Sequence, residues 1–152
     1  MAPRYRFGLL IGMVGLFLNI CISGLFGLCG PLAAFVAGGV AGFMTARSEQ
    51  PAVKADGARA GAVSGGIAGA LVLLGQICGG LGALALIQFS NTPTFGGTAP
   101  PPDADIMLQL IYYGTGFGTA LCFGIFGAVL AAIAGAGVGF LATPDQPASY
   151  PA

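Results

Sequence analysis

The side chains that could do chemistry in this chain are few, and the cysteines come first. Cys21, Cys29, Cys78 and Cys122 are candidate nucleophiles or metal ligands, and the chain contains no histidine to join them. No two of them form a CxxC pair, so neither a zinc site nor a redox motif is indicated. We therefore predict four buried, reduced thiols. A disulfide between Cys29 and Cys78 is the alternative for these two residues.

The carboxylates allow two interpretations of the segment around Asp56. This residue directly precedes Gly57-Ala58, where a long apolar segment begins. Its carboxylate is predicted to cap a helix there, because it can accept backbone N–H groups and face the positive helix end. The alternative is a cation or lipid-headgroup site that Asp56 forms together with Glu49.

Uncharged polar side chains within the apolar segments are also scarce. Asn19 and Gln76 lie on different segments, and we predict that they hydrogen-bond to each other at about 0.6–2 kcal/mol. The alternative is contact with a cofactor carbonyl or a pigment metal. Tyr112 and Tyr113 are predicted to anchor at a membrane interface, with quinone or pigment contact as the alternative.

No catalytic or metal-binding residue is predicted, since no nucleotide loop, metal cluster or nucleophile–base pair stands out in the sequence. No cofactor is predicted either, and contact with lipid, quinone or pigment is left open. The five basic and five acidic residues give zero formal net charge, which argues against nucleic acid as a partner.

Three long stretches of the chain contain no charged residue: Phe7 to Ala46, Ala60 to Pro102 and Ile106 to Pro144. Only 7% of the residues are charged and 56% are hydrophobic, whereas soluble domains carry roughly 25% charged residues. The composition therefore indicates an integral membrane protein. Proton pumps, ion transporters and haem proteins usually need ionisable groups inside the membrane, so those classes are disfavoured.

The first stretch is too long for one membrane span. As one helix it would measure about 60 Å, twice the roughly 30 Å hydrocarbon core. The sequence Gly27-Leu28-Cys29-Gly30-Pro31 favours a tight turn within it. We predict an all-α integral membrane four-helix bundle, built from two helical hairpins in a single domain, residues 1–152. The expected spans are about 5–26, 31–47, 57–89 and 105–141, with an outer loop at 90–104 and a C-terminal tail at 143–152.

The two last spans are longer than a bilayer requires. We expect them to tilt, protrude or break, and Gly79-Gly80-Leu81-Gly82 is the predicted break point.

The charge distribution supports an even number of spans. Four spans place all five basic residues on one side, namely Arg4, Arg6, Arg47, Lys54 and Arg59. The other side receives Asp103 and Asp105. The positive-inside rule then predicts cytoplasmic N- and C-termini, in a membrane that we expect to be a prokaryotic inner membrane.

Small residues recur every four positions along the spans, which places them on one helix face. The predicted packing interface comprises Gly57, Gly61, Gly65, Gly69, Gly38, Gly42, Gly116, Ala120, Gly124 and Ala128. A second stripe holds Gly127, Ala131, Gly135 and Gly139. Helices in lipid associate by close packing, which such faces permit. We interpret them first as the bundle interior, and second as a surface facing another protein or an identical copy.

Two segments, from Leu28 to Phe43 and from Ala55 to Gly65, resemble small prokaryotic four-span membrane proteins of unknown function. Those proteins share a Gly-Pro-led second span and an Asp-Gly-Ala start to a glycine-rich third span. The resemblance covers the first half of the chain and implies a membrane fold without a known activity.

Three functional hypotheses follow. The favoured one is a non-catalytic accessory or structural subunit that packs within a larger membrane protein complex, with other membrane proteins or itself and membrane lipid as partners. The alternative is a passive pore or small-solute channel formed by a homo-oligomer. An enzyme is the least favoured class.

Overall fold

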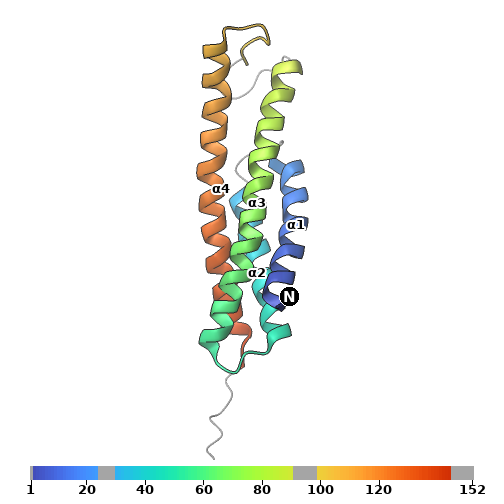
Figure 1. Cartoon of the computed structure of the whole chain (residues 1–152), viewed down its shortest axis with the longest axis vertical. Helices are drawn as coiled ribbons and strands as arrows, with labels where there is room; N and C mark the ends of the chain where they lie inside the picture. Colours follow the sequence, from blue (N-terminus) through green and yellow to red (C-terminus); the bar gives the residue numbers. More distant parts are fainter. Residues whose placement is uncertain (1, 24–29, 91–98, 145–152) are drawn as a thin grey trace, which may run out of the picture.

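The computed structural model describes residues 2–23, 30–90 and 99–144, and these residues form four helices and no strand (Figure 1). The helices are α1 (Pro3–Ser23), α2 (Gly30–Glu49), α3 (Lys54–Ser90) and α4 (Ile106–Ala142). The prediction of an all-α fold is confirmed for this part of the chain.

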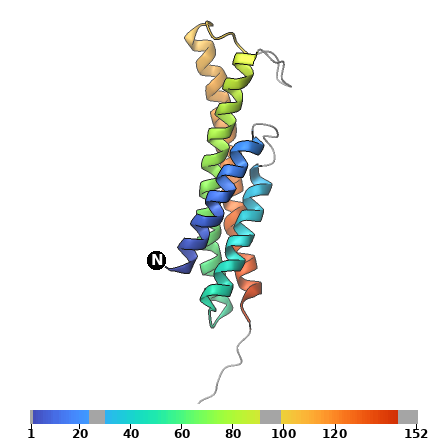
Figure 2. The ribbon, with the colours of Figure 1, turned by 90° about the vertical axis from the view of Figure 1, so that its right-hand side faces the viewer.

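The helices alternate in direction along the chain, so α1 and α3 run parallel to each other and α2 and α4 run the opposite way (Figures 1 and 2). α2 and α3 pack against each other through the middle, while α1 and α4 lie on opposite sides of that pair. The starts of α1 and α3 and the ends of α2 and α4 therefore gather at one end of the bundle.

The interior is made of small side chains and the exterior of large ones. The buried core consists of Ala34, Ala37, Ala41, Ala68, Val72 and Ala131. Large apolar side chains such as Phe17, Phe126 and Ile133 are more than half exposed, at 62%, 57% and 61%. Water would oppose this distribution, whereas lipid removes the penalty for exposing apolar surface and rewards close packing of small residues.

Three helices, α1, α3 and α4, are long and apolar enough to cross a membrane. α2 is not among them, and its last turn carries Arg47. α3 and α4 have 37 residues each, which corresponds to about 55 Å. α1 has 21 residues, or about 31 Å, so α3 and α4 project past it at the end with Ser90 and Ile106 (Figure 1).

The expected break at Gly79-Gly80-Leu81-Gly82 is absent, since α3 is one continuous helix through these residues. Gly80 and Gly82 leave room around the backbone rather than bending it. An added Cβ at Gly80 would come no closer than 3.7 Å to a neighbour, and one at Gly82 would meet nothing within 4 Å. Outside the described residues lie 24–29, which include most of the predicted turn at Gly27–Pro31, together with 91–98 of the predicted outer loop and 145–152 of the predicted tail.

Candidate packing and interaction site

A closely packed seam lies between α3 and α4. Gly57, Gly61, Gly65 and Gly69 are all buried on the face of α3 that meets α4. A Cβ added at Gly61 would overlap the carbonyl oxygen of Gly135. At this seam the two backbones are in direct contact, and a side chain larger than hydrogen would separate them.

Gly135 sits where three helices meet. A Cβ added there would overlap the carbonyl oxygen of Gly61 and fall 3.0 Å from the Cα of Gly65 and 3.1 Å from the carbonyl oxygen of Gly38. Gly42 is its second neighbour on α2, since a Cβ at Gly42 would meet the Gly135 carbonyl. One glycine on α4 therefore fixes the approach of both α2 and α3.

The predicted stripe of Gly116, Ala120, Gly124 and Ala128 on α4 also faces α3, and its upper part meets side chains of α3 instead of backbone. An added Cβ at Gly116 would meet Leu84, and one at Gly124 would fall 2.9 Å from Leu73 Cγ. Ala120 is buried between them, at 8% exposure. Lower on the same stripe, Ala128 returns to backbone contact, since its Cα lies 2.9 Å from a Cβ built at Gly69. The seam thus tightens toward the basic end of the bundle.

Asn19 links α1 to α3 in the buried part of the bundle. Its side-chain amide donates to the carbonyl oxygen of Val72 at 2.9 Å and to Gln76 Oε1 at 3.3 Å. Asn19 is fully buried and its Oδ1 has no hydrogen-bond partner. The Gln76 side chain fills the space beside Gly30, where a Cβ would overlap its Oε1, so the starting residue of α2 must be small here.

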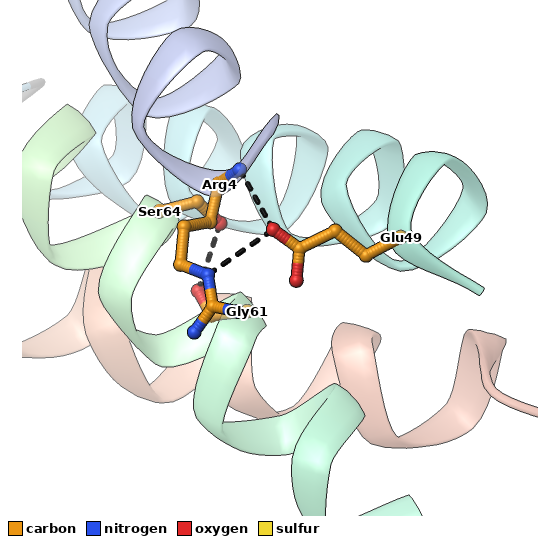
Figure 3. Close-up of polar contacts among 4 residues, drawn as sticks. All are labelled: Arg4, Glu49, Gly61 and Ser64. Atoms are coloured by element: carbon orange, nitrogen blue, oxygen red, sulfur yellow. Dashed lines mark hydrogen bonds and ion pairs between the residues drawn. The ribbon is translucent and has the colours of Figure 1, made fainter. Parts of the chain in front are cut away.

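A contact that the sequence did not suggest joins α1 to the end of α2. Glu49 Oε1 accepts hydrogen bonds from the backbone N–H of Arg4 at 3.0 Å and from its Nε at 3.1 Å (Figure 3). The first N–H groups of a helix lack partners within it, and a negative charge is favourable beside them. Glu49 therefore caps α1 from another helix while it neutralises the Arg4 side chain.

Asp56 lies within the first turn of α3, because this helix already begins at Lys54. Its carboxylate is exposed and 3.9 Å from Arg59 Nη1. Glu49 faces Arg4 instead, so the two carboxylates of the alternative cation site each have a basic neighbour of their own. Lys54 also lies over the Phe140 ring, 5.4 Å from its centroid, at the end of α4.

Two buried hydroxyl groups bond to backbone carbonyl groups of their own chain segment. Ser64 Oγ donates to the carbonyl oxygen of Gly61 at 3.1 Å, and Thr143 Oγ1 donates to that of Gly139 at 2.8 Å. Both side chains are buried, at 0% and 2% exposure. Since each hydroxyl has its acceptor one turn earlier in the chain, it needs no partner on a facing helix.

The projecting ends of α3 and α4 are joined by tyrosines. The Tyr113 hydroxyl donates to Gln88 Oε1 at 2.5 Å, and the Tyr112 hydroxyl to the carbonyl oxygen of Leu84 at 3.4 Å. Gln88 Nε2 in turn donates to the Pro100 carbonyl oxygen at 3.0 Å, which ties the described end of the outer loop to α3. Both tyrosines are half-buried and bond across to α3.

The prediction of buried thiols is wrong for Cys21, Cys78 and Cys122, which are exposed and free. The interior positions are so closely approached by facing backbones that glycine and alanine fill them, and the thiols lie on outer faces. The fourth cysteine, Cys29, and with it the question of a Cys29–Cys78 bridge, lies outside the described residues.

The contacts between helices described above come from close backbone packing, the Asn19 and tyrosine hydrogen bonds and the Glu49–Arg4 pair. Over residues 2–23, 30–90 and 99–144, no three histidine, cysteine or acidic side chains are grouped so that they could bind a metal ion. Comparisons with protein families, with curated proteins and with solved structures find no match for this chain. The resemblance to small four-span membrane proteins stays a prediction.

Proposed function

We propose that this chain is a four-span integral membrane protein with a non-catalytic, structural role, packing as an accessory subunit within a larger membrane protein complex. The observation that carries the proposal is the inverted distribution of side-chain size. Glycine and alanine fill the interior, while large apolar side chains cover the outside. Such an exterior suits lipid and the apolar faces of other membrane proteins.

In this proposal the glycine stripes act within the chain, and partners bind elsewhere. α4 covers the glycine stripe of α3, because Gly57, Gly61, Gly65 and Gly69 all lie against α4. The surface left for a partner is therefore the outer apolar face, including Phe17 on α1, Phe35 on α2 and Phe126 on α4. Phenylalanine is among the residues that are enriched in the buried cores of protein interfaces.

The proposed orientation follows the charges. Arg4, Arg47, Lys54 and Arg59 lie at the end where α1 and α3 begin and α2 and α4 end, and Asp103 and Asp105 lie at the other. The positive-inside rule places the basic end, and both termini, in the cytoplasm of a prokaryotic cell. Reporter fusions should test this: a C-terminal fluorescent protein is expected to fluoresce, whereas an active C-terminal alkaline phosphatase would reverse the orientation.

A pore through one copy is disfavoured by the packing at Gly135, where backbone atoms of α2 and α3 close the centre of the bundle. The buried amides of Asn19 and Gln76 bond to each other rather than line a path. A channel would have to form between copies, so it stays the alternative only for a homo-oligomer.

Site-specific photo-crosslinking in native membranes tests the subunit proposal. A photoreactive phenylalanine analogue is introduced in turn at Phe17, Phe35 and Phe126, which lie on three helices and are each about half exposed or more. At least one position is expected to yield an adduct with a different polypeptide. The same analogue at Val72, which is 1% exposed, serves as the inward control. Adducts with lipid alone, or only with a second copy, would contradict an accessory subunit.

A further inference from the structure

A groove opens on the outside of the bundle where α1 ends. Its volume is about 400 Å³, within the roughly 300–1,000 Å³ range of small-molecule pockets. Ile20 and Cys21 of α1 close its lower end, and Gly79, Gly82 and Leu86 of α3 line its length up to Ser90. The lining is mostly apolar, and Ser90 lies at the end that is farthest from α1.

The groove continues the surface on which α1 packs. Lower on α3, the positions that meet α1 are Ser64, Ala68 and Val72, against Gly8, Gly12 and Gly15. The same face of α3 goes on through Gly79, Gly82 and Leu86 after α1 has ended at Ser23. Among the described residues, only α1 and α3 line the groove, so α3 offers a track along which α1 would pack if it were longer.

The dimensions of the helices place this track within a membrane. The uncharged part of α3, from Ala60 to Ser90, measures about 45 Å, which matches the roughly 40–45 Å thickness of a bilayer with its headgroup regions. α1 measures about 31 Å and starts at the same basic end. It therefore stops within the leaflet on the acidic side, where Asp103 and Asp105 lie beyond the end of α3.

The track from Gly79 to Ser90 is about 16 Å long, and one leaflet supplies about half of the roughly 30 Å hydrocarbon core. The part of this track nearest Ser90 lies in the headgroup region and the rest in the hydrocarbon of that leaflet, so a rod-shaped apolar group attached to a headgroup fits this space. We propose that the groove holds one acyl chain of a membrane lipid from the acidic-side leaflet, parallel to α3, with the lipid headgroup at the level of Ser90. This inference rests on the membrane insertion proposed above, and it does not require a protein partner.

Gly82 offers a way to fill the groove without disturbing the fold. A Cβ at Gly82 meets nothing within 4 Å, so a Gly82→Phe side chain enters the groove and not a neighbouring helix. Gly114→Phe is the matched control, because a Cβ at Gly114 on α4 is equally free and this residue does not line the groove. Both changes replace a helical glycine, which favours the helix slightly.

The test uses vesicles of phosphatidylcholine and phosphatidylglycerol that contain a phosphatidylcholine with a diazirine in its acyl chain. After illumination, mass spectrometry should find lipid adducts concentrated on the α3 residues of the groove in the wild type and in Gly114→Phe. The same adducts should be lost in Gly82→Phe. Adducts unchanged by Gly82→Phe, or spread evenly over all outer faces, would overturn the proposal, as would a groove occupied by another polypeptide.

Alkaline carbonate extraction of the same vesicles separates this inference from the proposed function. A chain that stays in the membrane without groove adducts refutes the lipid site alone. A chain that the carbonate removes refutes membrane insertion, and with it both proposals.

Discussion

Glu49 shows how one side chain can organise two helix ends. Its carboxylate accepts both the backbone N–H and the Nε of Arg4, so it compensates an unpaired helix donor and a positive charge together. The Glu49 side chain is only 14% exposed, whereas that of Arg4 is 39% exposed. The Glu49–Arg4 pair is therefore less exposed to water than the Asp56–Arg59 pair, whose side chains are 58% and 82% exposed.

Replacing Glu49 with alanine should lower the free energy of unfolding by about 1–2 kcal/mol, because a charge-assisted bond to a helix start is lost and solvent screens part of it. Arg59→Ala is the control and should change it by less than about 0.5 kcal/mol, as expected of an exposed ion pair. Circular dichroism during unfolding in mixed detergent micelles measures both. Equal effects of the two changes would refute the capping role of Glu49.

Asn19 and Gln76 should couple energetically, since their amides bond in a buried place where water does not compete. A double-mutant cycle of Asn19→Ala and Gln76→Ala is expected to give a coupling free energy of about 0.6–1.7 kcal/mol. A cycle that pairs Asn19→Ala with Gln109→Ala should give none, because Gln109 donates to Pro102 at the far end. Strictly additive single changes would show that the Asn19–Gln76 bond contributes nothing.

Only some of the contacts between individual residues could be predicted from the sequence. The sequence singles out Asn19 and Gln76 because polar side chains are rare in the spans. It does not link Glu49 to Arg4, since they are far apart in the chain and only the packing of α1 on α2 and α3 brings them together. Burial of the cysteines was predicted from residue type, and the prediction failed because the approach of the backbones, not the apolar character of a thiol, decides what fits inside.

At the scale of one helix, α4 carries two glycines with opposite surroundings. Gly135 is enclosed by backbone atoms of α2 and α3, whereas a Cβ at Gly137 would meet nothing within 4 Å. The two positions share a residue type and a helix, and differ by two places in the chain. They therefore separate the effect of packing from the effect of helix propensity.

Gly135→Ala should lower the free energy of unfolding by about 1–3 kcal/mol, because a methyl group there forces packed helices apart. Gly137→Ala should leave it unchanged or raise it by up to about 1 kcal/mol, since alanine favours a helix over glycine. Unfolding followed by circular dichroism in micelles compares the two variants. A Gly135→Ala variant as stable as Gly137→Ala would mean that the seam is not closely packed.

The existence of helices was predictable, because long uncharged apolar stretches leave few other structures open to the backbone in lipid. The four-residue repeat also indicated which residues share a face. It did not tell which helix each face meets, because any small-residue stripe can pack on any other. The expected break in α3 failed for a related reason: glycine permits a bend, but continuous hydrogen bonding along the helix and its packing on α4 keep α3 intact.

At the scale of the whole molecule, the account is of a bundle that uses its small residues internally and turns its large apolar side chains outward. The two long helices reach past the shorter pair, so only α3 and α4 continue to the end that carries Ser90 and Ile106 (Figure 1). The role that we propose, a subunit placed beside other membrane proteins, rests on this distribution.

Native electrophoresis of membranes solubilised in a mild detergent, followed by mass spectrometry of the band that contains this chain, tests that account most directly. The account predicts a particle far heavier than the 15.0 kDa chain with its detergent, in which other membrane polypeptides co-migrate in constant proportion. A band that contains this chain alone, as a monomer or a small homo-oligomer, would contradict it and would make flux through an oligomeric pore the next property to measure.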